Sequence, residues 1–517
     1  MLAAIRSAAV LGIDAYDVTV EVDVALGMPN WFIVGLPASA VKESRERVGA
    51  ALVNAGYAVP PRRITVNLAP ADQRKEGTAF DLPMALGLLV GTGVLDAEAV
   101  ARCTVVGELG LDGSIRPVRG ALSIARRFHA RAGKENILVI PPANLPEASL
   151  VRGIRIAAPP TLSELVNALR TDALMAADAR VAAAPPEDEF DIADVAGQES
   201  AKRALAIAAA GAHGLLLVGP PGAGKTMLAR RLPTILPELT DAEALEVTAV
   251  HSVAGLLDPT AGVVARRPFR APHHSISTAG LVGGGSVPRP GEVSLAHHGV
   301  LFLDELLEFP RSVLETLRQP MEDGYVSIAR AATSVRFPAR FSLAAAMNPC
   351  PCGHAGDPAH PCICPAADVL RYRAKLSGPL ADRIDLHVNV PPVALADLAT
   401  RSRGEGSSSL RERVERARMR QRARYDDERG CNARAPGRWL ETHGALKPAA
   451  RTLLTTAGER LALSARAFHR VLRVARTIAD LDDSAAIDVP HVAEALGYRP
   501  RAAEALDERL PRATVTG

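Results

Sequence analysis

Hydrophobic and polar positions along the first 170 residues follow two different periods. The run YDVTVEVDVAL has an apolar side chain at every second position, which is typical of a strand with one buried face. In SAVKESRERVGAALVNAGY the apolar residues recur every three or four positions, so we expect a helix that is capped by Ser39 or Ser44 and ends at Gly56. RITVNLAPA and NILVIPPA predict further strands. The pattern indicates an N-terminal domain of strands and helices over residues 1–172.

Two breaks divide the rest of the chain. DALMAADARVAAAPPEDEF is rich in Ala, Pro and acidic residues, so we expect a linker at 173–190. From 191 to 395 the pattern becomes helix, buried strand, Gly-rich loop and helix, which predicts an α/β nucleotide-binding core. After the Gly- and Ser-rich TRSRGEGSSS, the segment 396–517 is expected to be a linker and a helical C-terminal part. We find no internal repeat.

Composition limits the class of protein. A chain of 517 residues is too long for one core, which agrees with several domains. The net charge is only +3, so any nucleic-acid contact has to come from local basic patches. No apolar run is long enough to span a bilayer, no signal peptide is visible, and six cysteines do not make a disulfide framework. We therefore expect a cytoplasmic protein without a membrane partner.

A phosphate-binding loop lies in the middle of the chain. The octapeptide GPPGAGKT follows the apolar run GLLLV and precedes a helical pattern, the context that separates this motif from a chance Gly-rich turn. Its backbone N–H groups and the N-terminus of the following helix suit the phosphates of ATP, and its lysine suits the β- and γ-phosphates. The residues expected to bind nucleotide are Gly219, Pro220, Pro221, Gly222, Ala223, Gly224, Lys225 and Thr226.

Polar residues end two further apolar strands. In GVLFLDELLEF, Asp304 suits Mg²⁺ together with the hydroxyl of Thr226, and Glu305 suits polarisation of the attacking water. In FSLAAAMNP, Asn348 can hold that water near the γ-phosphate. Two acids after a strand can also open a surface loop, but beside the phosphate loop we favour the magnesium site.

Four cysteines are grouped in one short segment as C-x-C, nine residues and C-x-C. Cys350, Cys352, Cys362 and Cys364 suit a tetrahedral structural Zn²⁺, with His354 and His360 as substitute ligands. The alternative is a loop of reduced cysteines without metal. Cys103 and Cys431 are isolated and expected to be inert.

The order of the phosphate loop, LFLDE, AMNP, LADRID and the helical SARAFHRVLRVARTIADL resembles that of AAA+ ATPases. RPFRAPHHSIS, NPCPCG and LSGPLADRIDLHV are similar almost word for word to the Mg-chelatase-like branch, and within it to the competence-associated ComM/YifB type. The resemblance covers essentially the whole chain. It implies an AAA+ core with a helical lid, a homo-hexameric ring, and an ATP-driven, helicase-like DNA motor for branch migration during natural transformation.

The resemblance also assigns arginines. Arg383 would be an arginine finger for the neighbouring subunit's γ-phosphate. Arg466, at the start of the lid helix, would be the sensor that contacts nucleotide in the same subunit, with Arg470 and Arg473 as rivals on a similar helix face. The alternative for each is a surface charge or a lid salt bridge.

Three segments carry candidate DNA contacts. VSIARAATSVRF predicts a β-hairpin whose Arg330, Arg336 and Arg340 either face DNA in a central channel or are ordinary solvated side chains. RPFRAPHHSISTAGLVGGGSVPRPGE is too long for a simple connection and suits an insertion lining that channel; its His273 and His274 lack the further ligands of a metal site. For the Arg-rich LRERVERARMRQRARY we favour a solvated linker helix over a DNA-facing one.

The N-terminal segment resembles the α+β proteolytic domain of Lon, a ribosomal S5 domain 2-like fold. The positions of the Lon serine and lysine are Ala79 and Leu122 here, and neither can act as nucleophile or base. We therefore expect a Lon-like domain without peptidase activity.

Three other functions share parts of this pattern. A chelatase subunit that drives metal insertion has the same ATPase core, but is not expected to carry the Lon-like domain or the cysteine loop. An ATP-dependent protease needs the missing Ser–Lys pair. A remodeller of protein partners would usually have an aromatic residue in its pore hairpin, for which Tyr325 is the nearby candidate.

Overall fold

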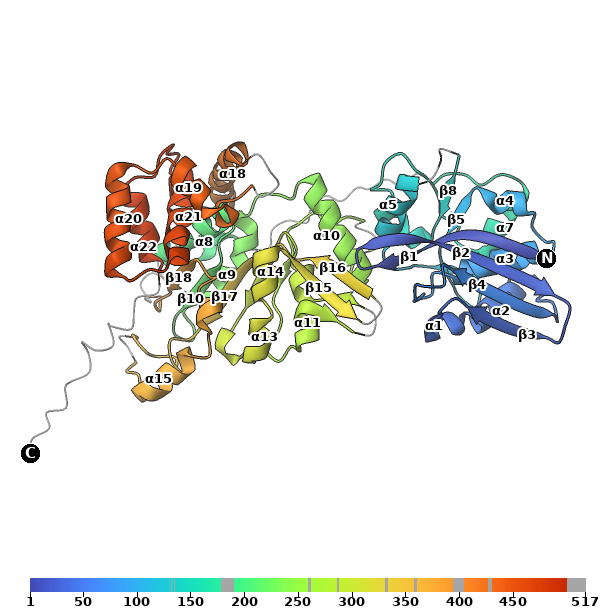
Figure 1. Cartoon of the computed structure of the whole chain (residues 1–517), viewed down its shortest axis with the longest axis horizontal. Coiled ribbons are helices and arrows are strands. Elements are labelled where there is room, and N and C mark those ends of the chain that lie inside the picture. The colour runs from blue at the N-terminus through green and yellow to red at the C-terminus, as the bar shows by residue number, and fades with distance from the viewer. Residues whose placement is uncertain are drawn as a thin grey trace, which may run out of the picture.

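The computed structural model shows an elongated molecule with three parts, an N-terminal sheet, a central sheet and a C-terminal helical part (Figure 1). It describes residues 1–131, 133, 135–177, 190–258, 262–285, 288–330, 333–357, 360–393, 404–425 and 430–499. Of the expected linker at 173–190, residues 178–189 lie outside this description. Among the described residues no helix is both long and apolar enough to cross a bilayer.

The N-terminal sheet has seven strands in the order β3-β4-β2-β1-β5-β8-β9. The strand predicted from YDVTVEVDVAL is confirmed as part of β2, and Val18, Val20, Val22 and Val24 on its inner face are buried. The strands of this part are β1 (Leu2–Leu11), β2 (Asp14–Ala25), β3 (Asn30–Val34), β4 (Arg63–Ala69), β5 (Cys103–Val105), β8 (Ile137–Val139), β9 (Arg155–Ala157) and the small pair β6 (Glu108–Leu109) and β7 (Ile115–Arg116).

Helices cover this sheet. The wholly buried α3 packs against β1 and β2, where a Cβ on Gly87 would lie 2.4 Å from a methyl group of Val22, so that glycine allows the close approach. The helices are α1 (Ser39–Lys42), α2 (Ser44–Asn54), α3 (Asp81–Gly91), α4 (Ala97–Ala101), α5 (Ala121–Arg131), α6 (Leu145–Ala148) and α7 (Leu162–Arg170).

The predicted helix ending near Gly56 is present but broken, and the prediction of its cap was wrong. Its two pieces, α1 and α2, have Ala38 and Glu43 at their N-cap positions, with no capping side-chain hydrogen bond. Ser44 instead donates to the buried Asp81 at 2.5 Å, and the same carboxylate pairs with Arg47. Ser44, one of the two serines expected to cap the helix, is therefore hydrogen-bonded to the ion pair between α2 and α3.

The central sheet has the order β11-β14-β17-β10-β18, and all its strand pairs are parallel. Parallel neighbours that are distant in sequence require crossovers, so the carboxyl ends of β10, β14 and β17 lie at one edge. The mixed α/β class with a parallel sheet is confirmed. The strands are β10 (Leu215–Val218), β11 (Phe269–Arg270), β14 (Val300–Leu303), β17 (Ser342–Met347) and β18 (Leu386–Asn389).

Helices and two small hairpins complete this part. The predicted hairpin is confirmed as the antiparallel pair β15 (Tyr325–Arg330) and β16 (Thr333–Pro338). A shorter pair, β12 (Gly283–Gly284) and β13 (Arg289–Pro290), lies in the long segment after β11. The helices are α8 (Glu199–Gly211), α9 (Lys225–Arg231), α10 (Asp241–Ala254), α11 (Thr278–Val282), α12 (Glu292–Leu295), α13 (Arg311–Glu315), α14 (Arg318–Asp323), α15 (Ala366–Arg373) and α16 (Gly378–Ala381).

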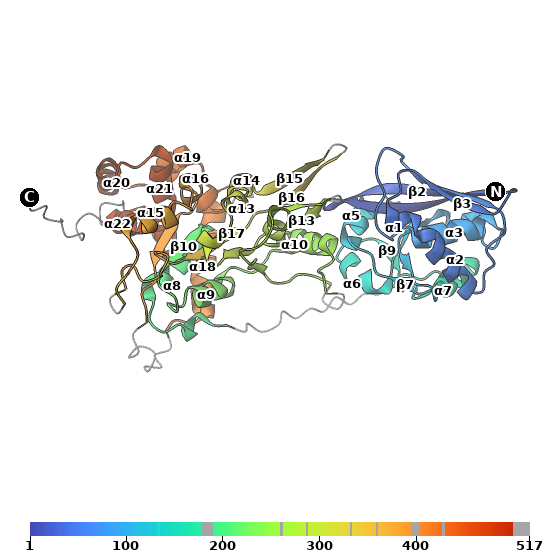
Figure 2. The ribbon, with the colours of Figure 1, turned by 90° about the horizontal axis from the view of Figure 1, so that it is seen from below.

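Within the described residues, the N-terminal part contacts the central part at the turn after β1 and around α10. The turn between β1 and β2 lies against the β15–β16 hairpin, where a Cβ on Gly12 would be 2.5 Å from Val335 (Figure 2). Helix α10 packs against α5, and Ser252 donates to the buried carboxylate of Glu147 at 2.5 Å. Burial raises the pKa of Glu147.

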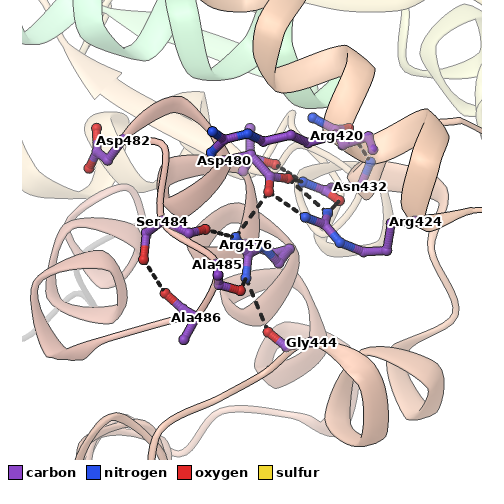
Figure 3. A network of polar contacts seen from close by, with 12 residues as sticks. Arg420, Arg424, Asn432, Gly444, Arg476, Asp480, Asp482, Ser484, Ala485 and Ala486 are labelled. Carbon is purple, nitrogen blue, oxygen red and sulfur yellow. Dashed lines mark hydrogen bonds and ion pairs between the residues drawn. The ribbon is translucent and has the colours of Figure 1, made fainter.

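The C-terminal part is helical, and its helices α18 and α21 pack against α8. Between α18 and α21 the buried carboxylate of Asp480 accepts from Arg476 and Arg424 (Figure 3). The helices are α18 (Ser407–Arg424), α19 (Gly437–His443), α20 (Pro448–Arg460), α21 (Ala465–Leu481) and α22 (Val489–Gly497).

The Arg-rich helix is α18, and its arginines make structural contacts. Arg411 donates to the carbonyl of Thr234, and Arg418 donates to that of Ala209. These bonds tie the helix to the central part, and α18 also packs against α8 and α21. The prediction of a solvated linker helix was therefore wrong, because one face of the helix is buried in the fold.

Candidate nucleotide site

The phosphate loop connects the buried strand β10 to helix α9. Gly222 and Gly224 have φ angles of 78° and 85°, in the left-handed region that favours glycine. At Gly219 a Cβ would lie 2.2 Å from the carbonyl oxygen of Val390, so only glycine fits there. The motif therefore forms the tight strand–loop–helix that its spacing predicts.

Lys225 lies inside this loop. Its Nζ donates to the carbonyls of Gly219 and Pro220 at 2.7 and 2.9 Å and to Oδ1 of Asn348 at 3.1 Å. Burial lowers the pKa of Lys225, while the charges of Asp304 and Glu305 act in the opposite direction. The ammonium group is thus held by backbone and amide oxygens at the point where the motif would place phosphates.

The acidic residues follow β14, next to the phosphate loop. Thr226 donates from Oγ1 to Oδ2 of Asp304 at 2.6 Å, so the hydroxyl and carboxylate suited to Mg²⁺ lie together. Glu305 has a φ of 50°, and its N–H donates to Asp304 at 2.9 Å. A left-handed residue other than glycine is strained, and such strain is common at functional sites.

Asn348 follows β17, the strand between β10 and β14. Its bond to Lys225 joins the third predicted strand end to the phosphate loop. The structure therefore brings together Lys225, Thr226, Asp304 and Asn348 at the carboxyl edge of the sheet. The assignment of individual catalytic roles stays a prediction.

Two neighbours of the site were not predicted from the sequence. His274, in the segment after β11, has Nδ1 3.4 Å from Oε2 of Glu305. Gln198, before α8, donates to the carbonyl of Pro391 at 2.6 Å and to that of Ala223, in the phosphate loop, at 3.5 Å. His274 lies in the segment RPFRAPHHSIS and Gln198 in no motif, and the sequence did not indicate the contacts of either residue with the site.

Arg383 lies elsewhere on the central part. It follows α16, donates to the carbonyl of Pro379 at 2.6 Å and forms an ion pair with Glu322 of α14. With Glu322 it lines a shallow depression bordered by α13, α14 and β15. The neighbours of Arg383 are therefore different from those of Lys225.

The three lid arginines have different surroundings on α21. Arg466 is exposed on the first turn, and Arg473 donates to the carbonyl of Ala435 at 2.8 Å. Arg470 is buried, 3.8 Å from Asp385 and 4.0 Å from Asp382. The structure thus brings Arg470, rather than Arg466, next to the segment that carries Arg383; the sensor role stays a prediction.

The four cysteines meet in one cluster. Their sulfur atoms all lie within 4.8 Å of one another, with Cys350 3.3 Å from Cys352 and 3.6 Å from Cys362. Tetrahedral zinc with Zn–S bonds of about 2.3 Å needs sulfurs about 3.8 Å apart, so the donor set fits. The backbone N–H of Cys352 also donates to the sulfur of Cys364 at 3.3 Å.

Glu246, His297 and His298 also lie close together, but they form a hydrogen-bond network. His297 accepts the backbone N–H of Arg340 at Nδ1, so its proton is on Nε2, which donates to Glu246 at 2.9 Å. A metal at Nε2 would have to displace that proton. This group is a hydrogen-bond network, in which His298 also approaches Glu246 at 2.8 Å.

The candidate DNA residues belong to the β15–β16 region. Arg336 is exposed, with its guanidinium 4.8 Å from the ring centre of Tyr325. Arg340 follows β16, and Arg330 ends β15 with a side chain outside the described part. In the N-terminal part, Ala79 is partly buried and Leu122 is fully buried.

Known protein families match all three parts of the chain. The family model "Magnesium chelatase, subunit ChlI" matches residues 191–398, "Subunit ChlI of Mg-chelatase" matches 20–144, and "Magnesium chelatase, subunit ChlI C-terminal" matches 404–499. Such ChlI-like domains belong to the AAA+ ATPases.

Two relatives match along nearly their whole length, and a third over half of it. Competence protein ComM of Haemophilus influenzae is 45% identical over 96% of this chain and 97% of its own. YifB of Escherichia coli is 41% identical with the same coverage. The magnesium-chelatase 38 kDa subunit of Rhodobacter capsulatus is 28% identical over 31% of this chain and 50% of its own. The chain therefore belongs to the ComM/YifB-type family of magnesium-chelatase-like proteins.

Proposed function

We propose that this protein is an ATP-driven DNA motor, a homo-hexamer with helicase or branch-migration activity in recombination during natural transformation. The observation that carries the proposal is the separation of two groups. Lys225, Thr226, Asp304 and Asn348 form one nucleotide site, whereas Arg383 lies with Glu322 among other elements. A site of this kind is completed when a neighbouring subunit supplies the arginine.

In that arrangement ATP would be bound by residues 219–226, with Mg²⁺ on Thr226 and Asp304. Glu305 would polarise the attacking water, and Asn348 would orient it. Arg383 of the next subunit would stabilise the charge that develops on the γ-phosphate. Contacts of this head-to-tail kind form a ring when the rotation between neighbouring subunits closes, as the proposed hexamer requires.

DNA is proposed as the substrate for two reasons. The relative from Haemophilus influenzae is named a competence protein. The β15–β16 hairpin carries the exposed Arg336, which suits a phosphate backbone, with Arg330 and Arg340 as further candidates. With an aromatic content of 3%, base stacking would contribute less than charge.

The remaining assignments complete the proposal. We propose domains at 1–172, 191–395 and 396–517 with a linker at 173–190, and a Lon-like fold without peptidase activity in the first. We propose structural zinc on the four cysteines, which are free of disulfides, as is usual in the cytoplasm. Arg466 remains the proposed nucleotide sensor.

A chelatase-like motor, driving metal insertion or remodelling of a protein partner, is the alternative. The family models carry the name of magnesium chelatase. However, the 38 kDa chelatase subunit matches 31% of this chain, whereas ComM matches 96%. The DNA motor is therefore favoured.

The test is the ATPase rate with and without single-stranded and forked DNA. We expect DNA to bind in a salt-dependent way and to stimulate hydrolysis, and Lys225→Ala to abolish turnover, because its ammonium group is lost from the phosphate site. ATP hydrolysis that responds to no DNA, together with absence of DNA binding, would contradict the motor and favour the alternative.

A further inference from the structure

The four-cysteine loop begins two residues after Asn348, directly beside the nucleotide site. Pro349, between them, accepts a hydrogen bond at its carbonyl from Nε of Arg373 at 3.1 Å. Cys350, the first cysteine, is fully buried. The start of the loop is thus fixed by α15 on one side and by the end of β17 on the other.

The same loop touches the phosphate loop at Gly353. This residue has a φ of 87°, and a Cβ placed on it would lie 2.6 Å from Cδ of Pro221. The backbone of the cysteine loop therefore lies directly on the ring of Pro221. Only a residue without a side chain permits that approach.

The residues at the two ends of this connection, Asn348 and Pro221, either contact Lys225 or lie next to a group that does. Its ammonium group donates to the carbonyl of Pro220, the neighbour of Pro221, and to the amide oxygen of Asn348. A displacement of the cysteine loop would move Pro221 and Asn348 at once, and with them two of the three oxygens that hold the lysine. Active-site groups displaced by about 1 Å lose much of their effect.

The cysteine cluster has the features needed to keep the loop in place. Two backbone N–H groups donate to its sulfurs, from Ala355 to Cys350 at 3.2 Å and from Cys352 to Cys364 at 3.3 Å. Without a metal, several thiolates this close repel one another; a bound Zn²⁺ removes that repulsion and fixes the loop.

We propose that the metal-bound cysteine loop positions the phosphate loop, so that zinc and ATP bind cooperatively through the contact of Gly353 with Pro221. The inference rests on the proposed ATP binding at residues 219–226. Gly353 acts as a positioning residue and touches no substrate. Because coupling between two binding sites is reciprocal, ATP should also strengthen zinc binding.

A matched pair of glycines tests the contact. Gly353→Ala adds a Cβ that meets Pro221, whereas Gly356→Ala adds one in the same loop at a similar φ of 83° with no atom within 4 Å. We expect both full-length variants to keep one zinc per chain. The affinity for a fluorescent ATP analogue should fall at least about tenfold in Gly353→Ala and stay near wild type in Gly356→Ala. Equal affinities in the two zinc-containing variants would overturn the proposal.

Removal of zinc tests the coupling between zinc and ATP binding without a substitution at Gly353. Wild-type protein stripped by a chelator, and the Cys362→Ser variant at the exposed cysteine, should both bind the ATP analogue at least about tenfold more weakly. A saturating non-hydrolysable ATP analogue should slow zinc release to a chromogenic chelator. Unchanged affinity after zinc loss, or a purified protein that holds no zinc, would overturn the proposal. Failure of the zinc-loaded wild type to bind ATP would instead contradict the proposed function.

Discussion

Burial changes the protonation of one histidine in this protein. His297 is almost fully buried, and burial lowers its pKa to about 4 despite the nearby Glu246. The ordinary pKa of histidine is about 6.5. In the folded protein His297 therefore stays neutral over a pH range in which an unfolded chain would bind a proton.

This difference predicts a pH dependence of stability. Between about pH 6.5 and 4 the unfolded state binds more protons at His297, so the free energy of unfolding falls as the pH falls through that window. We expect the melting temperature of wild type to drop between pH 7 and 5, and to drop less in His297→Gln, which cannot titrate. Thermal unfolding at matched pH values measures both slopes. The same slope in variant and wild type would show that His297 does not contribute.

Some residues of the candidate site could be predicted from the sequence, and others could not. Gly219, Lys225 and Thr226 are predictable because one short motif contains their strand, loop and helix. The contact of Gly353 with Pro221 and the ion pair of Arg383 with Glu322 join residues over sixty positions apart. Such pairs depend on how elements pack, so no local sequence pattern predicts them.

Among the elements, α18 and α21 are joined by a buried ionic group. Asp480 is fully buried and holds the guanidinium groups of Arg476 and Arg424, while Asn432 donates to it at 2.9 Å (Figure 3). One carboxylate thus balances two arginines from two helices. A nearby exposed pair joins Arg420 of α18 to Asp483, which follows α21, at 2.8 Å.

The same substitution at the two aspartates should lower the free energy of unfolding by different amounts. Asp480→Asn leaves two arginines with a reduced or absent counter-charge in the interior, which should lower the free energy of unfolding by about 3 kcal/mol or more. Asp483→Asn breaks an exposed pair and should cost about 1 kcal/mol or less. Denaturant unfolding of both variants makes the comparison. Equal losses would mean that the buried group does not hold the two helices together.

Elements also differ in how far their patterns predict them. The β2 strand and the β15–β16 hairpin have clear periodicity, and the structure confirms both. The pattern ending at Gly56 predicts one helix with a serine cap, but the helix is broken at Glu43, and Ser44 donates to Asp81 instead of capping it. A buried partner elsewhere in the fold therefore overrides a local capping signal.

For the whole molecule, the N-terminal part contacts the central part at the β15–β16 hairpin and at α10. The turn at Gly12 packs on Val335, and Glu147 accepts from Ser252. Neither contact follows from the sequence of one part alone, since each joins surfaces of separate folding patterns. A DNA contact at the hairpin would therefore be made close to the N-terminal part.

The central claim is that one subunit's nucleotide is hydrolysed with the help of its neighbour's Arg383. It predicts that Arg383→Ala binds ATP normally but does not turn over, whereas Lys225→Ala retains its arginine and lacks a working phosphate site. Each variant alone should be inactive for a different reason.

Mixing the two purified variants tests this claim most directly. In a randomly mixed ring, about one neighbouring pair in four combines an intact phosphate loop with an intact Arg383, so the mixture should recover up to about a quarter of the wild-type ATPase rate. Wild-type protein mixed with buffer gives the reference. If the mixture stays as inactive as the separate variants after the subunits have been shown to exchange, Arg383 does not act across the interface and the account is contradicted.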